Sequence, residues 1–440
     1  MTPRLAIGGA GLLALVACGV PEPKITVSED ITTFATASWT FATDSRTRIE
    51  VTNDDGPWLT TDWQEGAASH EVGLLGLFAD TTYQARLVVE DGDASPYVTF
   101  ATGDIPASLP RWTIDGEPGW EGFVLTAIVG GDTEASTLVI FDELGRVVWY
   151  HQGRKGHRIL RVRLLPDRSG LRYAEIETVP EPETSALVTV SWSGEELSRV
   201  EIPGFTHDFV DTPEGDAMCI VLDIRQGRGE LDVLGDAIEP VTADGPGEPI
   251  WSIWDHATPP VDADMEQQVW THANAIDWDP DRQSYWLGLR ELSQIVQVFP
   301  DGTQGAQFGG TEPTWAIADP ADATKFQHQF EFFGDELLVF DDRDPKTAEE
   351  SRLMQYTLDD AAGTATPTWE WHHPDHLQVI TLGDVDRAAD GSTLAVFSSS
   401  GVVVDLDPNG EIRWQLETEF ASVIPYVVRV PDLPGVSRVR

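Results

Sequence analysis

The chain has 440 residues, of which 74 are acidic and 28 are lysine or arginine, so its formal net charge is −46. This excess of negative charge excludes a nucleic-acid partner and favours a soluble, salt-tolerant surface. It does not exclude a local anion-binding site, because charges are screened over about 8 Å at physiological ionic strength.

The N-terminus has the pattern of a lipoprotein export signal. A positively charged start precedes a short apolar run, and Leu15-Val16-Ala17-Cys18 then matches the bacterial lipobox. The apolar run is too short to span a bilayer. We therefore expect residues 1–17 to be a signal peptide, Cys18 to be lipidated and residues 18–24 to form a tether. Gly19 after the cysteine favours anchoring in the outer membrane, on its periplasmic or its cell-surface face.

A first unit of short alternating strands is expected over residues 25–101. Trp39 lies early in this unit, and the segment from Leu77 to Tyr83 lies late. The late segment resembles the fibronectin type III pattern, in which a tyrosine closes a corner between two strands. We interpret the unit as a β-sandwich of this kind with Trp39 in its core. Residues 102–110, which are rich in glycine and proline, form the linker that follows.

Residues 111–433 show strand pairs and a recurring phrase instead of helical periodicity. The phrase is an aspartate, a glycine turn and an apolar run that ends in tryptophan, as in the segments that end at Trp149 and at Trp414. Six such units begin near residues 112, 157, 205, 270, 326 and 380. We therefore predict an all-β protein, in which a six-bladed β-propeller follows the small sandwich and most tryptophans pack the blades.

Three histidines stand at the heads of strand-like segments in this region. They are His207 in Thr206-His207-Asp208, His272 in Thr271-His272-Ala273-Asn274, and His328 in Phe326-Gln327-His328. Each of the two gaps between them has the length of one blade plus a loop. If each histidine opens the innermost strand of its own blade, all three imidazoles point into one central channel.

Hairpin geometry adds two further residues to this candidate site. The turn at Asp279-Pro280-Asp281-Arg282 places position 290 opposite position 272, so Arg290 returns to the channel end of His272. The same construction about Gly334-Asp335 brings Asp341 beside His328. There, Asp341 would orient the imidazole or cap the turn.

The residues alone leave two other kinds of protein open. Three converging histidines are a ligand set for zinc, copper or iron, with Asp341 as a fourth ligand, although Arg290 disfavours a dication. A lipidated sandwich–propeller protein can also be a non-catalytic surface protein that binds a ligand or partner. A single histidine would be read as a structural side chain. Three at equivalent blade positions with a paired arginine favour a functional site.

Four segments carry a more specific resemblance, which spans nearly the whole exported chain. They are Thr271–Asp277, Leu287–Arg290, Phe326–His328 and Ser351–Tyr356. These segments resemble the bacterial arylsulfotransferase family, whose members are periplasmic or surface six-bladed propellers, often with an N-terminal β-sandwich. The resemblance implies transfer of a sulfuryl group from a small aryl sulfate donor to a phenol acceptor, without a nucleotide sulfate donor, a metal or another cofactor.

The same resemblance implies a role for each site residue. His328 matches the histidine that becomes transiently sulfurylated, whereas His207, His272 and Arg290 match the residues that hold the sulfuryl oxygens. Thr271 and Asn274 belong to the same motif, and we count them with Asp341 as substrate-binding residues. The chain departs from the family at Phe340-Asp341-Asp342-Arg343, where a Phe-Asp-Asn-Gly type of sequence is common, and it has no cysteine pair near the site.

These residue types suit the implied chemistry. A neutral His328 would attack sulfur and expel a phenol, and a second phenol would then attack the sulfurylated imidazole. Arg290 and a protonated His207 or His272 would neutralise charge on the transferring oxygens. One of these histidines would also protonate the departing oxygen.

Overall fold

The structure is a computed structural model. It describes residues 19–41, 44–66, 69–129, 135–178, 182–226, 232–259, 269–347, 349–419 and 422–439. The predicted signal peptide and Cys18 lie outside these residues. The described part includes the short 3₁₀ segments η1 (Ile253–Asp255), η2 (Arg290–Leu292), η3 (Pro320–Asp322) and η4 (Ser398–Ser400). No helix in the described part is long and apolar enough to cross a membrane.

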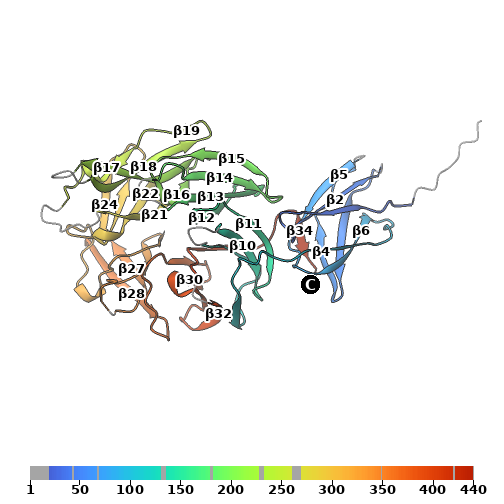
Figure 1. The fold of residues 1–440 in the computed structure, drawn as a ribbon. Helices are drawn as coiled ribbons and strands as arrows, with labels where there is room; N and C mark the ends of the chain where they lie inside the picture. Colours follow the sequence, from blue (N-terminus) through green and yellow to red (C-terminus); the bar gives the residue numbers. More distant parts are fainter. Residues whose placement is uncertain are drawn as a thin grey trace, which may run out of the picture.

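Six antiparallel sheets form the blades of a β-propeller (Figure 1). From the channel outward, blade one contains β33 (Val427–Val430), β9 (Phe123–Ile128), β10 (Thr137–Asp142) and β11 (Val147–Gln152). Blade two contains β12 (His157–Leu164), β13 (Gly170–Glu177), β14 (Ala186–Ser191) and β15 (Glu196–Glu201). Blade three contains β16 (Phe205–Asp211), β17 (Ala217–Gln226), β18 (Asp232–Thr242) and β19 (Gly245–Pro246), and β20 (Trp251–Ser252) also pairs with β18.

The other three blades follow in chain order. Blade four contains β21 (Ala273–Asp279), β22 (Ser284–Leu289), β23 (Gln294–Val298) and β24 (Gln304–Gly309). Blade five contains β25 (Phe330–Phe333), β26 (Glu336–Asp341), β27 (Arg352–Asp359) and β28 (Thr364–His372). Blade six contains β29 (Asp384–Arg387), β30 (Thr393–Phe397), β31 (Val402–Leu406), β32 (Ile412–Thr418) and β8 (Trp112–Gly116). The inner strands β12, β16, β21, β25, β29 and β33 contact one another in succession around the channel.

The ring closes between its first and last blades, and here one expectation was wrong. A blade was expected to begin near residue 112, but β8 is the outermost strand of blade six, where it pairs with β32. The innermost strand of blade one is β33 from the C-terminal part of the chain, which pairs with β9. Both exchanges join the two ends of the propeller by backbone hydrogen bonds.

The recurring aspartate–glycine phrase is a side-chain-capped turn between blade strands. The carboxylate of Asp142 accepts hydrogen bonds from the backbone N–H groups of Leu144 and Arg146, and Gly145 has a φ of +73° that favours glycine. Asp407 caps the equivalent turn of blade six in the same way. The tryptophans that end the two phrases, Trp149 and Trp414, are fully buried, as the prediction of blade-packing residues requires.

The N-terminal sandwich has two sheets. One contains β1 (Lys24–Val27), β2 (Ala35–Thr40) and β5 (Ser69–Leu74), and the other contains β34 (Val436–Arg438), β4 (Gly56–Thr61), β3 (Thr47–Asn53), β6 (Thr82–Val89) and β7 (Val98–Ala101). The C-terminal strand β34 therefore returns to the sandwich, where Figure 1 shows it in red among the blue strands. Trp39 and Tyr83 share the core of the sandwich. The Tyr83 hydroxyl accepts a hydrogen bond from the Phe78 N–H at 2.8 Å. A corner tyrosine makes this kind of bond.

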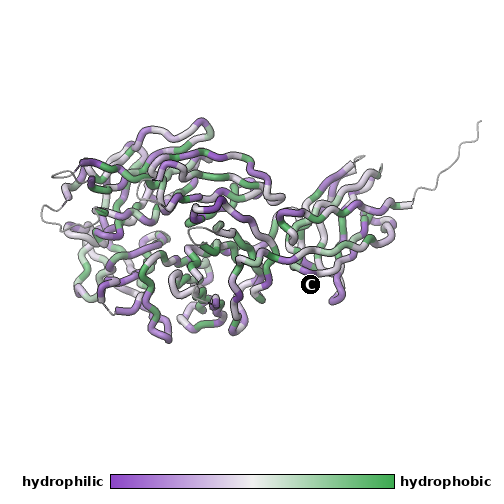
Figure 2. Tube along the Cα trace, viewed as in Figure 1, coloured by the Kyte–Doolittle hydropathy of each residue, from purple (hydrophilic) through white to green (hydrophobic). Residues whose placement is uncertain are grey.

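Apolar packing is continuous from the sandwich into the propeller. Ile31, Phe34 and Leu75 of the sandwich belong to the same buried cluster as the strands of blade one. Hydrophobic stretches accordingly run through the sheets of both parts in Figure 2. The fold class is therefore the predicted one, an all-β chain with a six-bladed propeller after a small sandwich.

Candidate functional site

The three histidines lie at the heads of inner strands in three consecutive blades. His207 is within β16, His272 directly precedes β21, and His328 lies two residues before β25. The Nε2 atoms of His207 and His272 are 3.1 Å apart, and their ring centroids are 4.8 Å apart. The propeller therefore brings together histidines that are 65 residues apart in the chain.

Irregular backbone aims these side chains away from the regular pleat. His207 has a φ of +54° and His272 has a φ of +51°. This left-handed conformation is one that L-residues rarely adopt. The strand register shifts at both places, between Phe205 and Phe209 and between Ala273 and Ala275. Such bulges redirect side chains at functional sites, and the strain of about 1–3 kcal/mol per residue must be held by neighbouring contacts.

Two buried aspartates supply those contacts, and neither was predicted as a site residue. Asp236 of β18 accepts a 2.5 Å hydrogen bond from the Thr271 hydroxyl and a 2.7 Å bond from the Ala273 N–H, so it holds the chain on both sides of His272. Burial raises the pKa of Asp236 to about 7. Asp208, the residue after His207, accepts a hydrogen bond from the Phe209 N–H.

Asp208 in turn is held by a buried arginine. Its carboxylate is paired with Arg161 of β12, with Nε at 3.1 Å from Oδ1. It also accepts a 3.3 Å hydrogen bond from the Ile276 N–H in β21. The Asp208 side chain therefore links the inner strands of blades two, three and four.

Arg290 lies at the channel end of the hairpin, as the turn geometry predicted. Its backbone N–H donates to the His272 carbonyl at 3.1 Å, and its side chain is buried. The guanidinium is paired with Glu291 at 2.5 Å, and its centre lies 5.1 Å from the ring centroid of Phe326. A second carboxylate, Asp342, lies 3.9 Å from the Arg290 Nε.

Burial makes all three imidazoles neutral in the free site. Desolvation lowers the pKa of His207 to about 4, with Asp208 opposing this shift and Arg290 adding to it. The pKa values of His272 and His328 fall well below the ordinary range for the same two reasons, with the other histidines adding to the effect. In the free site, burial and Arg290 therefore disfavour a protonated His207 or His272, and Arg290 is a cation that acts on all three rings.

Asn274 connects the histidine of blade four with that of blade five. Its Nδ2 donates a 2.9 Å hydrogen bond to the carbonyl of Gln327, the residue before His328. Gln327 is itself fully buried and donates to the Gln294 carbonyl at 2.9 Å. In the structure Asn274 and Thr271 both contact protein groups that position the histidines.

Asp341 lies where the hairpin register placed it, but its carboxylate has other partners than His328. The backbone pairing is present, because the His328 N–H donates to the Phe340 carbonyl at 3.0 Å. The Asp341 carboxylate accepts from Arg352 Nε at 2.9 Å, from Arg343 at 3.3 Å and from the Lys325 N–H at 2.8 Å. These contacts give Asp341 the turn-capping and strand-linking role instead of a place against the imidazole.

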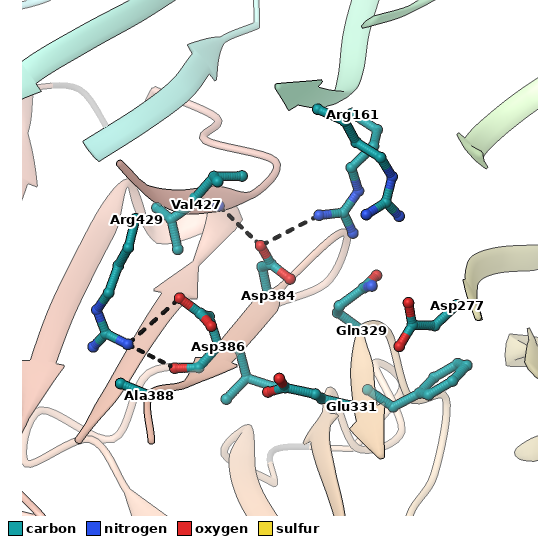
Figure 3. Close-up of a pocket in the computed structure, with 13 residues that line it drawn as sticks. Arg161, Asp277, Gln329, Glu331, Asp384, Asp386, Ala388, Val427 and Arg429 are labelled. Carbon is teal, nitrogen blue, oxygen red and sulfur yellow. Dashed lines mark hydrogen bonds and ion pairs between the residues drawn. The ribbon is translucent and has the colours of Figure 1, made fainter. Parts of the chain in front are cut away.

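A cavity of about 340 Å³ lies among charged side chains of the inner strands (Figure 3). Gln329, the residue after His328, lines it together with Asp277, Glu331 and Asp384. Figure 3 shows Asp384 between the Val427 backbone and Arg161, which it meets at 2.8 and 3.6 Å respectively. Burial raises the pKa of Asp384 to about 6.

Among the described residues, no group of three or more histidine, cysteine, aspartate or glutamate side chains is arranged to hold a metal ion. The contacts of the site are instead hydrogen bonds and ion pairs that fix the imidazoles around Arg290. Asp208 directly follows a candidate histidine and Asp342 lies in the segment that departs from the family pattern, so the sequence contained a signal for both. Asp236 follows Gly235 in an ordinary strand and carried none.

The fold and these side chains define a six-bladed β-propeller with a histidine–arginine centre on its inner strands. The chain belongs to the arylsulfotransferase family, because the family model described as Arylsulfotransferase (ASST) matches residues 122–405, more than half of the chain. The match covers His207, His272, Arg290 and His328. No curated protein matches the chain.

Solved structures that resemble this chain do so at low identity. A protein of unknown function from Bacteroides caccae is 14% identical, with 70% of this chain and 98% of that chain covered and a TM-score of 0.46. A putative 6-phosphogluconolactonase from Bacteroides fragilis is 10% identical, with coverages of 89% and 99% and a TM-score of 0.42. The periplasmic gluconolactonase PpgL of Pseudomonas aeruginosa is 13% identical, with coverages of 90% and 99% and a TM-score of 0.38.

Proposed function

We propose that this protein transfers a sulfuryl group from an aryl sulfate ester to a phenol by double displacement through His328. The observation that carries the proposal is the buried, neutral imidazole of His328, which lies within the electrostatic influence of Arg290, His207 and His272. A neutral imidazole has the lone pair that a nucleophile needs, and a single guanidinium supplies charge for an anionic group. Membership of the arylsulfotransferase family supports this assignment.

In the first step a ring nitrogen of His328 bonds to sulfur while the bond from sulfur to the aryl oxygen breaks. The electron pair of that bond leaves with the oxygen, which needs a proton to depart as a phenol. In the second step the acceptor phenol oxygen bonds to sulfur, its proton is released, and the bond from nitrogen to sulfur breaks. In both steps Arg290 supplies positive charge for the sulfuryl oxygens, and the neutral His207 and His272, which are hydrogen-bonded to each other through their Nε2 atoms, lie beside it.

The donor should be an aryl ester and not an alkyl ester. A phenol has a pKa of about 10. Water, which stands here for the alcohol of an alkyl ester, has a pKa of about 15.7, so the pKa values of the two leaving groups differ by roughly 6 units. At about 1.36 kcal/mol per unit, this difference is worth at most about 8 kcal/mol in leaving-group stability.

The direct test is to trap the sulfurylated residue. Wild-type protein incubated with a chromogenic aryl sulfate without acceptor should carry a sulfuryl group on the peptide that contains His328, and adding a phenol should discharge it. His328→Ala should lose at least about a thousand-fold in transfer rate. His376→Ala is the matched control, because His376 is 79% exposed and pairs with Glu350 on a loop.

Two outcomes would contradict the proposal at different levels. If wild-type protein releases no phenol, or its rate does not respond to the acceptor, transfer is not the activity. If His328→Ala keeps full activity, the nucleophile is another residue while the reaction class stands.

We also propose that the protein is exported and anchored in the outer membrane through a lipid on Cys18. Support comes from the lipobox pattern alone, since residues 1–18 lie outside the described structure. Cys18→Ser should then move the protein from the membrane fraction to the soluble fraction of the producing bacterium. Equal membrane retention of both proteins would overturn the anchor.

A further inference from the structure

Asp342 is a buried carboxyl group that has no hydrogen-bond partner. It follows the last residue of β26 and is 1% exposed. Neither Oδ1 nor Oδ2 has a hydrogen-bond partner. An isolated buried carboxylate is costly, so such a group is either protonated or placed for a ligand.

The neighbouring aspartate shows how unusual this arrangement is. Successive side chains of a strand point to opposite faces. Asp341 points to one face, where Arg343, Arg352 and a backbone N–H satisfy its carboxylate. Asp342, the first residue after the strand, has a different ion-pair partner, Arg290 of η2, with Nε at 3.9 Å from Oδ2.

Arg290 ties this carboxyl group to the histidine centre. The same guanidinium acts electrostatically on His207, His272 and His328. The charged groups that act on Asp342 are Arg290, which favours its ionised form, and Asp341 on its own strand, which opposes it. Ser351, on the segment before β27, donates to the Asp342 backbone carbonyl and not to its side chain.

The charge of the site depends on the proton of Asp342. The three imidazoles are neutral, and Arg290 is flanked by Glu291 and Asp342. With both carboxylates ionised, the group of three carries one net negative charge and repels an anion. With Asp342 protonated, the group is neutral and also offers an O–H donor next to the guanidinium. Burial raises the pKa of Asp342 well above its ordinary value despite Arg290.

We infer that Asp342 is the acid–base residue of the sulfuryl transfer. In the first step its carboxyl proton passes to the aryl oxygen as the bond from sulfur to oxygen breaks, which leaves a carboxylate beside Arg290 and a sulfurylated His328. In the second step this carboxylate takes the proton of the acceptor phenol as the phenol oxygen attacks sulfur. One proton thus leaves and returns in each cycle. This inference rests on the proposed function and concerns the segment in which this chain departs from the family pattern, so the acid–base role of Asp342 is a property of this chain.

The test uses Asp342→Asn, which keeps the shape of the side chain and removes its acid. The first step is followed as the burst of released phenol, with two donors: nitrophenyl sulfate, whose leaving group needs no proton, and phenyl sulfate, whose leaving group does. We expect the variant to lose about 10²- to 10⁴-fold with phenyl sulfate and less than about tenfold with nitrophenyl sulfate. The wild-type rate with phenyl sulfate should fall as pH rises through the Asp342 pKa. The rate of the variant should not show this fall.

Glu291→Gln is the matched control, because it removes the other carboxylate that contacts Arg290. It should change the KM for both donors alike and leave the ratio of their rates unchanged. If Asp342→Asn shows the wild-type ratio and pH profile while His328 is still sulfurylated, the acid–base role is overturned and the proposed function stands. If wild-type protein forms no adduct on His328, the proposed function itself fails.

Discussion

The ion pair between Arg161 and Asp208 offers a quantitative test of how the site is supported. Asp208→Asn is nearly isosteric, so it leaves no cavity. It removes the negative charge that faces Arg161 Nε at 3.1 Å. An amide nitrogen at the Oδ2 position would no longer accept from the Ile276 N–H, which lies 3.3 Å away. The perturbation is therefore electrostatic and local.

The size of the effect follows from burial. Arg161 is 9% exposed. Removing one partner of a buried ion pair costs about 3–5 kcal/mol, because the other charge stays buried without compensation. Asp384 remains at 3.6 Å as a second, weaker partner of Arg161. We therefore expect the lower end of the range, a loss of about 3 kcal/mol in the free energy of unfolding. The loosened chain at His207 should also lower the transfer rate.

The assay is urea unfolding followed by tryptophan fluorescence, with the transition of the propeller analysed separately from that of the sandwich. Arg161→Met and the double variant Arg161→Met, Asp208→Asn serve as controls. Because Asp208→Asn leaves the Arg161 charge with one partner fewer, the loss in the double variant should be smaller than the sum of the two single losses. A change within about 0.5 kcal/mol for Asp208→Asn, the usual range for surface substitutions, would refute the reasoning.

Two further predictions address the channel and the segment behind His328. Burial raises the pKa of Glu331 to about 7, so the folded protein keeps a proton that the unfolded chain releases from about pH 4.5 upward. As pH rises through this window, the unfolding free energy of the wild type should fall relative to Glu331→Gln by at most about 3 kcal/mol, and parallel pH curves would contradict this. Gly383 has a φ of +140°, and a Cβ there would lie 2.5 Å from the Phe340 ring. Gly383→Ala should therefore cost about 1–3 kcal/mol and slow transfer at the neighbouring His328. Gly363→Ala, where φ is +64° and the nearest atom is 3.4 Å away, should leave the transfer rate unchanged in the same assay.

Local patterns predicted those parts of the fold that depend on local geometry. The alternation and turns of blade four fix its register, so Arg290 opposite His272 followed from the position of one turn. The capped turns at Asp142 and Asp407 likewise follow from residues four or fewer apart. The closure of the propeller ring, in contrast, could not be predicted from local patterns. Nothing near Val427 marks it as part of an inner strand of blade one, because its partner β9 lies at the opposite end of the propeller sequence.

The same limit explains which site residues were missed. Asp236 supports His272 from the adjacent blade, and the two are joined by folding and not by a motif. The Arg161 that holds Asp208 comes from blade two, 47 residues earlier. The burial of the histidine side chains could also not be predicted from the sequence, and burial decides their charge. In the free site burial disfavours the expected imidazolium for this reason, while the positions of the rings were predicted from spacing.

Burial acts in opposite directions on the two kinds of titratable group beside Arg290. It disfavours the charged form of each, so it removes the proton from an imidazole and keeps the proton on a carboxyl group. The pKa of His328 is therefore lowered and that of Asp342 raised by one cause, without any special chemistry at either residue. The transfer that we propose for this chain uses this combination, an unprotonated nucleophile and a protonated acid near one cation. Exposure of the channel to water would bring the pKa values of His328 and Asp342 back toward their ordinary values. A single substitution that admits water should therefore weaken both the nucleophile and the acid.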